Sequence, residues 1–172
     1  MKKILLLFIF LALPVSLLAA DSVKFGAMDL QKVLNESEAG KKAKSDLEDL
    51  IKSKESMIEE KGKTVEKLKS DLEKQASALS TEARKKKEDE LEKLLREYQR
   101  SVQDSQAEVK KKEGELTDNI IKDIREIVEK IGVEQGYTLI IEKGIVLYSN
   151  KGIEITDDVM KKYNELKNKT KK

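Results

Sequence analysis

The five residues L-S-T-E-A at positions 79–83 decide the fold, because they interrupt a long run of residues that favour helix. Ser80 or Thr81 is a suitable N-cap residue, and Glu82 suits the first turn of a helix. Residues 36–131 contain no proline and are rich in Glu, Lys, Leu and Ala. The sequence therefore predicts one long helix before Ser80 and a second long helix after it.

Apolar residues recur at helical spacing on both sides of this break. Before it, they follow a seven-residue period, with a companion row that is partly filled: Ile51, Ile58, Val65, Leu72 and Leu79, with Leu47 and Leu68. After it, the pattern restarts with Leu91, Leu95, Tyr98, Val102, Val109 and Leu116. This spacing is typical of helices that pack along a narrow apolar seam.

Folding the chain back at Ser80 brings the two apolar rows into register. The predicted pairs are Ile51 with Val109, Ile58 with Val102, and Val65 with Leu95. We therefore predict an antiparallel helical hairpin over residues 36–131, with arms of about 45–50 residues and roughly 65–75 Å each. Polar residues in the companion row leave two interpretations open, a solvated edge or a deliberately compliant arm: Lys54, Lys61 and Gln75.

Segments with a period of two flank the helical region. V-K-F-G-A-M at 23–28 predicts a strand, and residues 29–35 predict one helical turn starting at Asp29. Y-T-L-I-I-E at 137–142 and I-V-L-Y at 145–148 predict a tight β-hairpin around residues 143–144. Residues 153–155 predict a further short strand, and Thr156 predicts the cap of a final helix. Residues 21–35 and 132–172 would then form a small body at the base of the hairpin.

A sheet of this size is marginal as an isolated unit, so we expect several copies of the chain to share one body. The side chains expected at this assembly are Val23, Phe25, Leu139, Ile141, Val146 and Tyr148. The predicted fold class is α+β, with a small β body formed by oligomerisation and a long antiparallel α-helical hairpin, a coiled-coil tentacle, on each protomer.

Residues 1–20 have the pattern of a secretory signal peptide. Lys2 and Lys3 precede an apolar run over residues 4–13, and L-A-A at 18–20 provides small residues for cleavage. The run is shorter than the ~20 residues that span a bilayer. We expect cleavage after about Ala20 and export of the remaining chain.

The composition excludes several function classes. The 172 residues include neither Cys nor His, so the chain has no zinc cluster, cysteine nucleophile or histidine base. The net charge is +2, and loss of Lys2 and Lys3 makes the chain neutral, which argues against nucleic-acid binding. No glycine-rich phosphate loop is present. We expect no enzyme activity, no catalytic residue, no cofactor and no metal.

Three stretches resemble the Skp/OmpH-like periplasmic chaperone family. They are V-K-F-G-A-M-D-L-Q-K-V-L-N-E-S-E-A-G at 23–40, L-S-T-E-A-R at 79–84, and G-Y-T-L-I-I-E-K-G-I-V-L-Y-S-N-K-G-I-E-I-T-D-D-V-M-K-K-Y at 136–163. The resemblance implies a periplasmic homotrimer whose three hairpins surround a central cavity. It implies an ATP-independent holdase that binds unfolded outer-membrane β-barrel proteins before their insertion, and contact with lipopolysaccharide or a membrane surface at residues that it does not identify.

Clients of such a chaperone would meet apolar residues outside the main seam and basic residues near the arm tip. The apolar candidates are Leu50, Met57, Leu94 and Ala107, and the basic candidates are Arg84, Lys85, Lys86 and Lys87. Well-known family members are strongly basic, whereas this chain is neutral after cleavage, so we expect weaker long-range attraction of acidic clients. The alternative is a structural coiled-coil adaptor of the cell envelope, which would have no affinity for unfolded clients.

Overall fold

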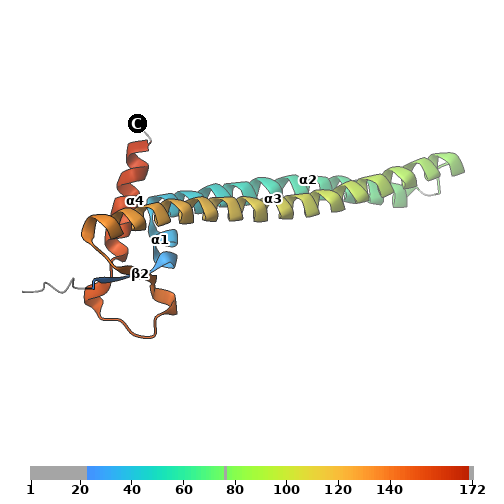
Figure 1. The fold of residues 1–172 in the computed structure, drawn as a ribbon. Helices are drawn as coiled ribbons and strands as arrows, with labels where there is room; N and C mark the ends of the chain where they lie inside the picture. The colour runs from blue at the N-terminus through green and yellow to red at the C-terminus, as the bar shows by residue number, and fades with distance from the viewer. Residues whose placement is uncertain (1–22, 76, 171–172) are drawn as a thin grey trace, which may run out of the picture.

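The structure, a computed structural model, describes residues 23–75 and 77–170, and it consists of a small body that carries one long arm (Figure 1). The predicted signal peptide, residues 1–20, lies outside the described residues. The elements in chain order are β1 (Phe25–Met28), α1 (Leu30–Glu36), α2 (Glu38–Gln75), α3 (Thr81–Gln135), β2 (Leu139–Glu142), the 3₁₀ turns η1 (Lys143–Ile145) and η2 (Lys151–Ile153), and α4 (Thr156–Thr170).

Helices α2 and α3 form the arm, and they run in opposite directions side by side (Figure 1). Ser80, one of the two predicted cap candidates, is the N-cap of α3, and its side chain accepts a hydrogen bond from the Ala83 amide at 3.2 Å. The 38 residues of α2 and 55 residues of α3 correspond to about 57 and 82 Å of helix. The break at Ser80 therefore does fold the chain back on itself.

The register between the two helices differs from the predicted one by two residues. Lys54 contacts Glu108 at 2.6 Å, Lys61 contacts Ser101 at 2.5 Å, and Lys87 contacts Gln75 at 2.8 Å. The prediction placed Ser80 at the midpoint of the pairing, but the first turn of α3 extends past the end of α2. The predicted partner of Val65, Leu95, is consequently 40% exposed, so its assignment to the seam is wrong.

The sheet contains two parallel strands rather than the predicted β-hairpin. Strand β1 pairs with β2 in parallel, from Phe25 opposite Leu139 to Met28 opposite Glu142. The second half of the predicted hairpin is absent from the described chain, because residues 143–145 form a 3₁₀ turn and residues 146–148 are not a strand. The predicted strand at 153–155 is reduced to a single bridge between Ala27 and Glu154.

Side chains near the sheet join α1 to the last third of the chain. A helical turn was predicted to start at Asp29, and this residue is the N-cap of α1, where its side chain accepts a hydrogen bond from the Lys32 amide at 2.8 Å. The amide of Asp29 donates to the Thr156 hydroxyl at 2.9 Å. Thr156 was predicted to cap α4, but it is the first residue of that helix and its hydroxyl binds α1's cap residue and Glu154 instead.

The hydrophobic core lies where α1, α3 and α4 meet. The last part of α3 presents one apolar face to α4, so the inner end of the arm is also a wall of the body. The core residues are Met28, Val33, Ile120, Ile124, Ile127, Ile131, Ile155, Val159 and Tyr163. By contrast, Ser105 is the only buried residue among those described between positions 44 and 115. The outer arm therefore has a seam but no core.

Candidate functional site

The four apolar candidates on the arm differ in their exposure. Met57 is 37% exposed and Ala107 is exposed, so both offer apolar surface to solvent. Leu94 is half-buried, seven residues before Ser101 and seven after Lys87, both of which contact α2. It therefore belongs to the seam side of α3. Leu50 is half-buried and lines a shallow groove with Asp46, Glu108, Lys111, Lys112 and Glu115.

The four basic candidates lie in the first two turns of α3, at the outer end of the arm. Arg84 forms an ion pair with Glu88 at 2.8 Å, and Lys87 donates to Gln75 at 2.8 Å across the arm. Lys85 and Lys86 are exposed, and no ion pair or hydrogen bond of their side chains occurs among the described residues. Only part of the run therefore remains available as free positive charge.

The six body candidates include four that are strongly exposed in a single chain. Val23 is 59% exposed, Phe25 and Leu139 are each 49% exposed, and Tyr148 is 85% exposed. Phe25 and Leu139 lie opposite each other in the strand register. Ile141 and Val146 are half-buried.

Sequence reasoning missed two residues of this surface, Ile145 at 79% and Leu147 at 106% exposure. Both lie in the loop over residues 143–154, which an ion pair of Lys143 with Glu154 at 2.8 Å holds closed. That Lys143 hydrogen bond lowers the pKa of the Glu154 carboxyl from its ordinary value. The I-V-L-Y run at 145–148 was the signal in the sequence for these two residues. Because we predicted a strand there, its alternation placed Ile145 and Leu147 on the face opposite to Val146 and Tyr148, the two residues expected at the assembly.

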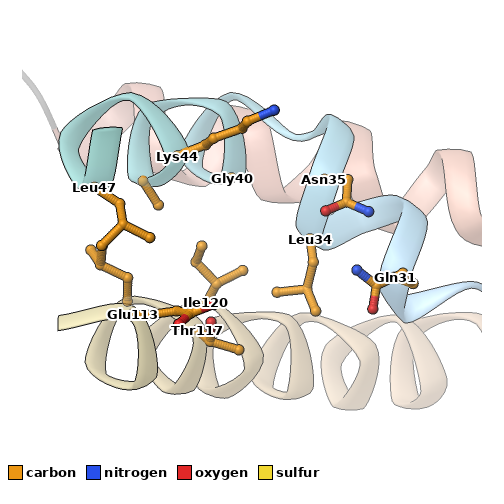
Figure 2. Close-up of a pocket in the computed structure, with 11 residues that line it drawn as sticks. Gln31, Leu34, Asn35, Gly40, Lys44, Leu47, Glu113, Thr117 and Ile120 are labelled. Carbon is orange, nitrogen blue, oxygen red and sulfur yellow. The ribbon is translucent and has the colours of Figure 1, made fainter. Parts of the chain in front are cut away.

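A concave surface at the inner end of the arm was also missed. We call it the root crevice, a cavity of about 300 Å³ between α1, α2 and α3 (Figure 2). Its lining residues are Gln31, Leu34, Asn35, Gly40, Ala43, Lys44, Leu47, Glu113, Leu116, Thr117 and Ile120. The spacing of Gln31, Leu34 and Asn35 on one helical face was the only signal in the sequence.

The root crevice is held in shape by tight contacts at the junction of α1 and α2. A Cβ atom at Gly40 would lie 1.8 Å from the carbonyl oxygen of Leu34. The buried hydroxyl of Ser37 accepts a hydrogen bond from the Gly40 amide at 3.0 Å. The amide of Glu38 at the start of α2 donates to Asn164 of α4 at 3.0 Å. The junction is therefore fixed from both the α1 and α4 sides.

A second anchor fixes α4 against α3. The hydroxyl of buried Tyr163 donates to Asp123 at 3.3 Å, and Lys167 forms an ion pair with the same carboxylate at 2.5 Å. Burial raises the pKa of the Tyr163 phenol well above its usual value, and the charge of Asp123 raises it further. The phenol therefore stays protonated and serves as a hydrogen-bond donor.

The described residues include no group of three or more His, Cys, Asp or Glu side chains that could hold a metal ion. Every buried side-chain polar atom in this part of the chain has a hydrogen-bond partner. None of the described helices combines the length and the apolar character that a membrane span requires.

Comparison with known proteins gives a family and a fold. The model of the family described as outer membrane protein (OmpH-like) matches residues 24–163. A crystal structure of an OmpH-like protein from Caulobacter crescentus CB15, proposed to be an outer membrane chaperone, matches with a TM-score of 0.79 and 15% identity. The match covers 84% of this chain and 85% of that one. No curated protein matches the sequence.

Proposed function

Because this chain belongs to the OmpH-like outer membrane protein family, we propose that it is an ATP-independent holdase that binds unfolded outer-membrane β-barrel proteins in the periplasm. The proposed site is the space between arms that project from a homotrimeric body. Binding there would prevent aggregation of the client before its insertion into the outer membrane.

The observation that carries this proposal is the construction of the arm. Between residues 44 and 115 only Ser105 is buried among the described residues, while Met57 and Leu95 keep more than a third of their surface exposed. The arm therefore offers scattered apolar spots on a charged surface. An unfolded outer-membrane strand presents alternating apolar side chains, and many weak contacts with such an arm would add up to useful affinity.

The homotrimer is supported by the apolar surface of the body. Phe25, Leu139 and Tyr148 would remain in water if the chain stayed a monomer. Soluble monomers rarely expose contiguous apolar patches of this kind. Native mass spectrometry would count the subunits, with three copies expected.

The test of the holdase is aggregation of an outer-membrane β-barrel protein after dilution from urea, followed by light scattering. We expect the full chain, added in slight molar excess as trimer, to suppress the scattering without any nucleotide. A short-armed variant lacking residues 54–110, with a short glycine–serine linker in their place, should retain its subunit count and lose suppression. Suppression by the short-armed variant would contradict binding between the arms, and no suppression by the full chain would favour a structural adaptor.

A further inference from the structure

We propose that the root crevice is a docking site for one large apolar side chain of an extended client segment, an inference that rests on the proposed holdase function. The scattered spots of the outer arm would hold a client diffusely. The root crevice would instead provide a fixed point where an aromatic or branched aliphatic side chain is recognised.

The floor of the root crevice is apolar and belongs to three different helices. The apolar lining residues that we call the floor are Leu34 of α1, Ala43 and Leu47 of α2, and Leu116 and Ile120 of α3. Figure 2 shows Leu34, Leu47 and Ile120 around the same space. The volume of about 300 Å³ exceeds that of a phenylalanine side chain, so the space is large enough for one ring. Transfer of such a ring from water to an apolar surface is favourable in proportion to the area buried.

The mouth of the root crevice carries groups that match a peptide backbone. Gln31 and Asn35 lie one turn apart on α1, are exposed, and have no side-chain hydrogen bond within the described residues. Each amide offers both donors and an acceptor, as a peptide unit requires. Residues one helical turn apart are separated by about 5–6 Å, which is close to the ~6.7 Å between alternate residues of an extended strand.

The charges on the rim favour a neutral occupant. Lys44 and Glu113 both line the root crevice, and neither forms an ion pair or hydrogen bond among the described residues. One positive and one negative charge at the same mouth give no preference for a phosphate, a carboxylate or a cation. An uncharged peptide with one apolar side chain satisfies the floor and the mouth together.

A client segment is a better match than a second copy of this chain. The two most exposed large apolar residues among those described, Leu147 and Tyr148, lie in the 143–154 loop. This loop extends from the side of the body away from the arm, whereas α1, α2 and α3 enclose the root crevice at the arm itself (Figure 1). An outer-membrane strand alternates apolar and polar residues, so one apolar side chain enters while its neighbours remain in water.

The test is a double-mutant cycle between protein and peptide. The probes are two nine-residue peptides of alternating threonine and serine, with either phenylalanine or alanine at the centre. Binding is measured by titration of the methyl signals of Leu34, Leu47 and Leu116 in NMR spectra of the full chain. We expect the phenylalanine peptide to bind about tenfold more tightly than the alanine peptide, because it buries the ring.

Filling the root crevice should remove this preference. In Ala43→Phe the new ring occupies the cavity, so the two peptides should bind equally. The control Gln99→Phe places the same ring on the exposed face of the arm and should keep the tenfold difference. A preference that survives in Ala43→Phe would overturn the proposal, as would the lack of a preference in the unmodified chain.

A second variant avoids the interior and keeps the proposal testable if Ala43→Phe does not fold. The double substitution Gln31→Ala and Asn35→Ala removes the amides and should weaken both peptides several-fold while the phenylalanine preference remains. Unchanged affinity would overturn the proposal. A changed subunit count of this variant in native mass spectrometry would also overturn it, since a second copy would then cover the mouth.

The same protein sample separates this inference from the proposed function. If the unmodified chain suppresses aggregation of a urea-unfolded barrel protein but shows no phenylalanine preference, only the docking site is wrong. If it suppresses no aggregation, the holdase and the docking site are both wrong.

Discussion

At the scale of single residues, Gly40 shows how little space separates α1 from α2. The Leu34 carbonyl would lie 1.8 Å from a Cβ atom at position 40, and that oxygen belongs to rigid backbone. Gly114, in α3, has no atom within 4 Å of the corresponding position. The two glycines therefore differ in role although both lie within long helices.

Gly40→Ala should lower the free energy of unfolding by about 2 kcal/mol or more, because the added methyl group forces the α1–α2 junction apart. Gly114→Ala should raise it by about 1 kcal/mol through helix propensity alone. Urea denaturation followed by circular dichroism, at one protein concentration, measures both values. Equal effects in the two variants would contradict the steric explanation.

Tyr163 gives the stability of the protein a dependence on alkaline pH. Its raised pKa in the folded chain means that folding favours the protonated phenol. The stabilisation is complete well below the unfolded pKa of about 10 and is lost as pH rises from there towards the folded pKa. Tyr163→Phe should therefore be less stable than the unmodified chain by about 1 kcal/mol at pH 8.

At pH 11 this difference between the unmodified chain and Tyr163→Phe should shrink or reverse, since phenylalanine does not ionise. Urea midpoints at the two pH values give the measurement. Tyr98→Phe is the matched control because the Tyr98 hydroxyl has no hydrogen-bond partner among the described residues. A constant difference between the unmodified chain and Tyr163→Phe at both pH values would refute this role.

Local signals at this scale were reliable where the interaction is local. The sequence offered Ser80 as one of two cap candidates and Asp29 as a helix start, and each side chain accepts a hydrogen bond from an amide three residues ahead. Thr156 was misread because its hydroxyl binds the amide of Asp29, 127 residues away. The close approach at Gly40 was invisible for a related reason, since it depends on how two helices cross.

At the scale of elements, polar pairs replace apolar ones along part of the arm seam. Lys61 donates to Ser101, and Lys54 pairs with Glu108. Both contacts lie at positions that a tight coiled coil fills with leucine. Such pairs are worth little in exposed settings, so the seam is weaker than a continuous apolar row.

The double substitution Lys61→Leu and Ser101→Leu should stabilise the arm by about 1–3 kcal/mol, because two leucine side chains would pack where a lysine now meets a serine. This gain in stability should slow hydrogen exchange of the amides in residues 55–70 and 95–108. A gain of about 1.4 kcal/mol corresponds to roughly tenfold slower exchange. Lys69→Leu with Gln99→Leu, on the exposed faces, is the control and should show no such slowing. Unchanged exchange in the seam variant would mean that the polar pair does not soften the arm.

The long helices were predictable from sequence, whereas the strands were only partly so. The helices follow from composition, period and one cap, which are properties of neighbouring residues. The predicted hairpin failed because the turn at residues 143–144 is closed by Glu142, whose side chain accepts from the Gly144 amide, and by the Lys143–Glu154 ion pair. The parallel partner of β2 lies 114 residues earlier, and no local pattern reports it.

At the scale of the whole molecule, the body of a single chain exposes several large apolar side chains, among them Phe25, Leu139 and Tyr148. Leu139→Asp should dissociate the proposed trimer, because it places a charge in the apolar contact between copies. Sedimentation velocity should show a smaller particle with retained helix content. Leu95→Asp, on the exposed arm, should leave the sedimentation coefficient unchanged, and an unchanged coefficient for Leu139→Asp would exclude that side chain from the assembly.

The candidate sites were predicted less completely than the architecture. The strongly exposed body residues Phe25 and Leu139 were identified because strand alternation places them on one face. Leu94 was assigned to free arm surface because the predicted seam ran through Leu95, and adjacent residues of a helix lie about 100° apart around its axis. The root crevice needs three helices at once, so only the folded chain reveals it.

The parallel pairing of β1 with β2 also sets an order of folding as the chain is synthesised. Residue 25 is synthesised long before residue 139, so β1 has no partner until the whole arm has been made. The helices form from nearby contacts and fold quickly, whereas strand closure joins distant positions and comes late. A nascent chain halted between residues 136 and 138 would thus contain both complete arm helices beside an unpaired β1. In the proposed trimer, assembly through the sheet would wait for the final 34 residues.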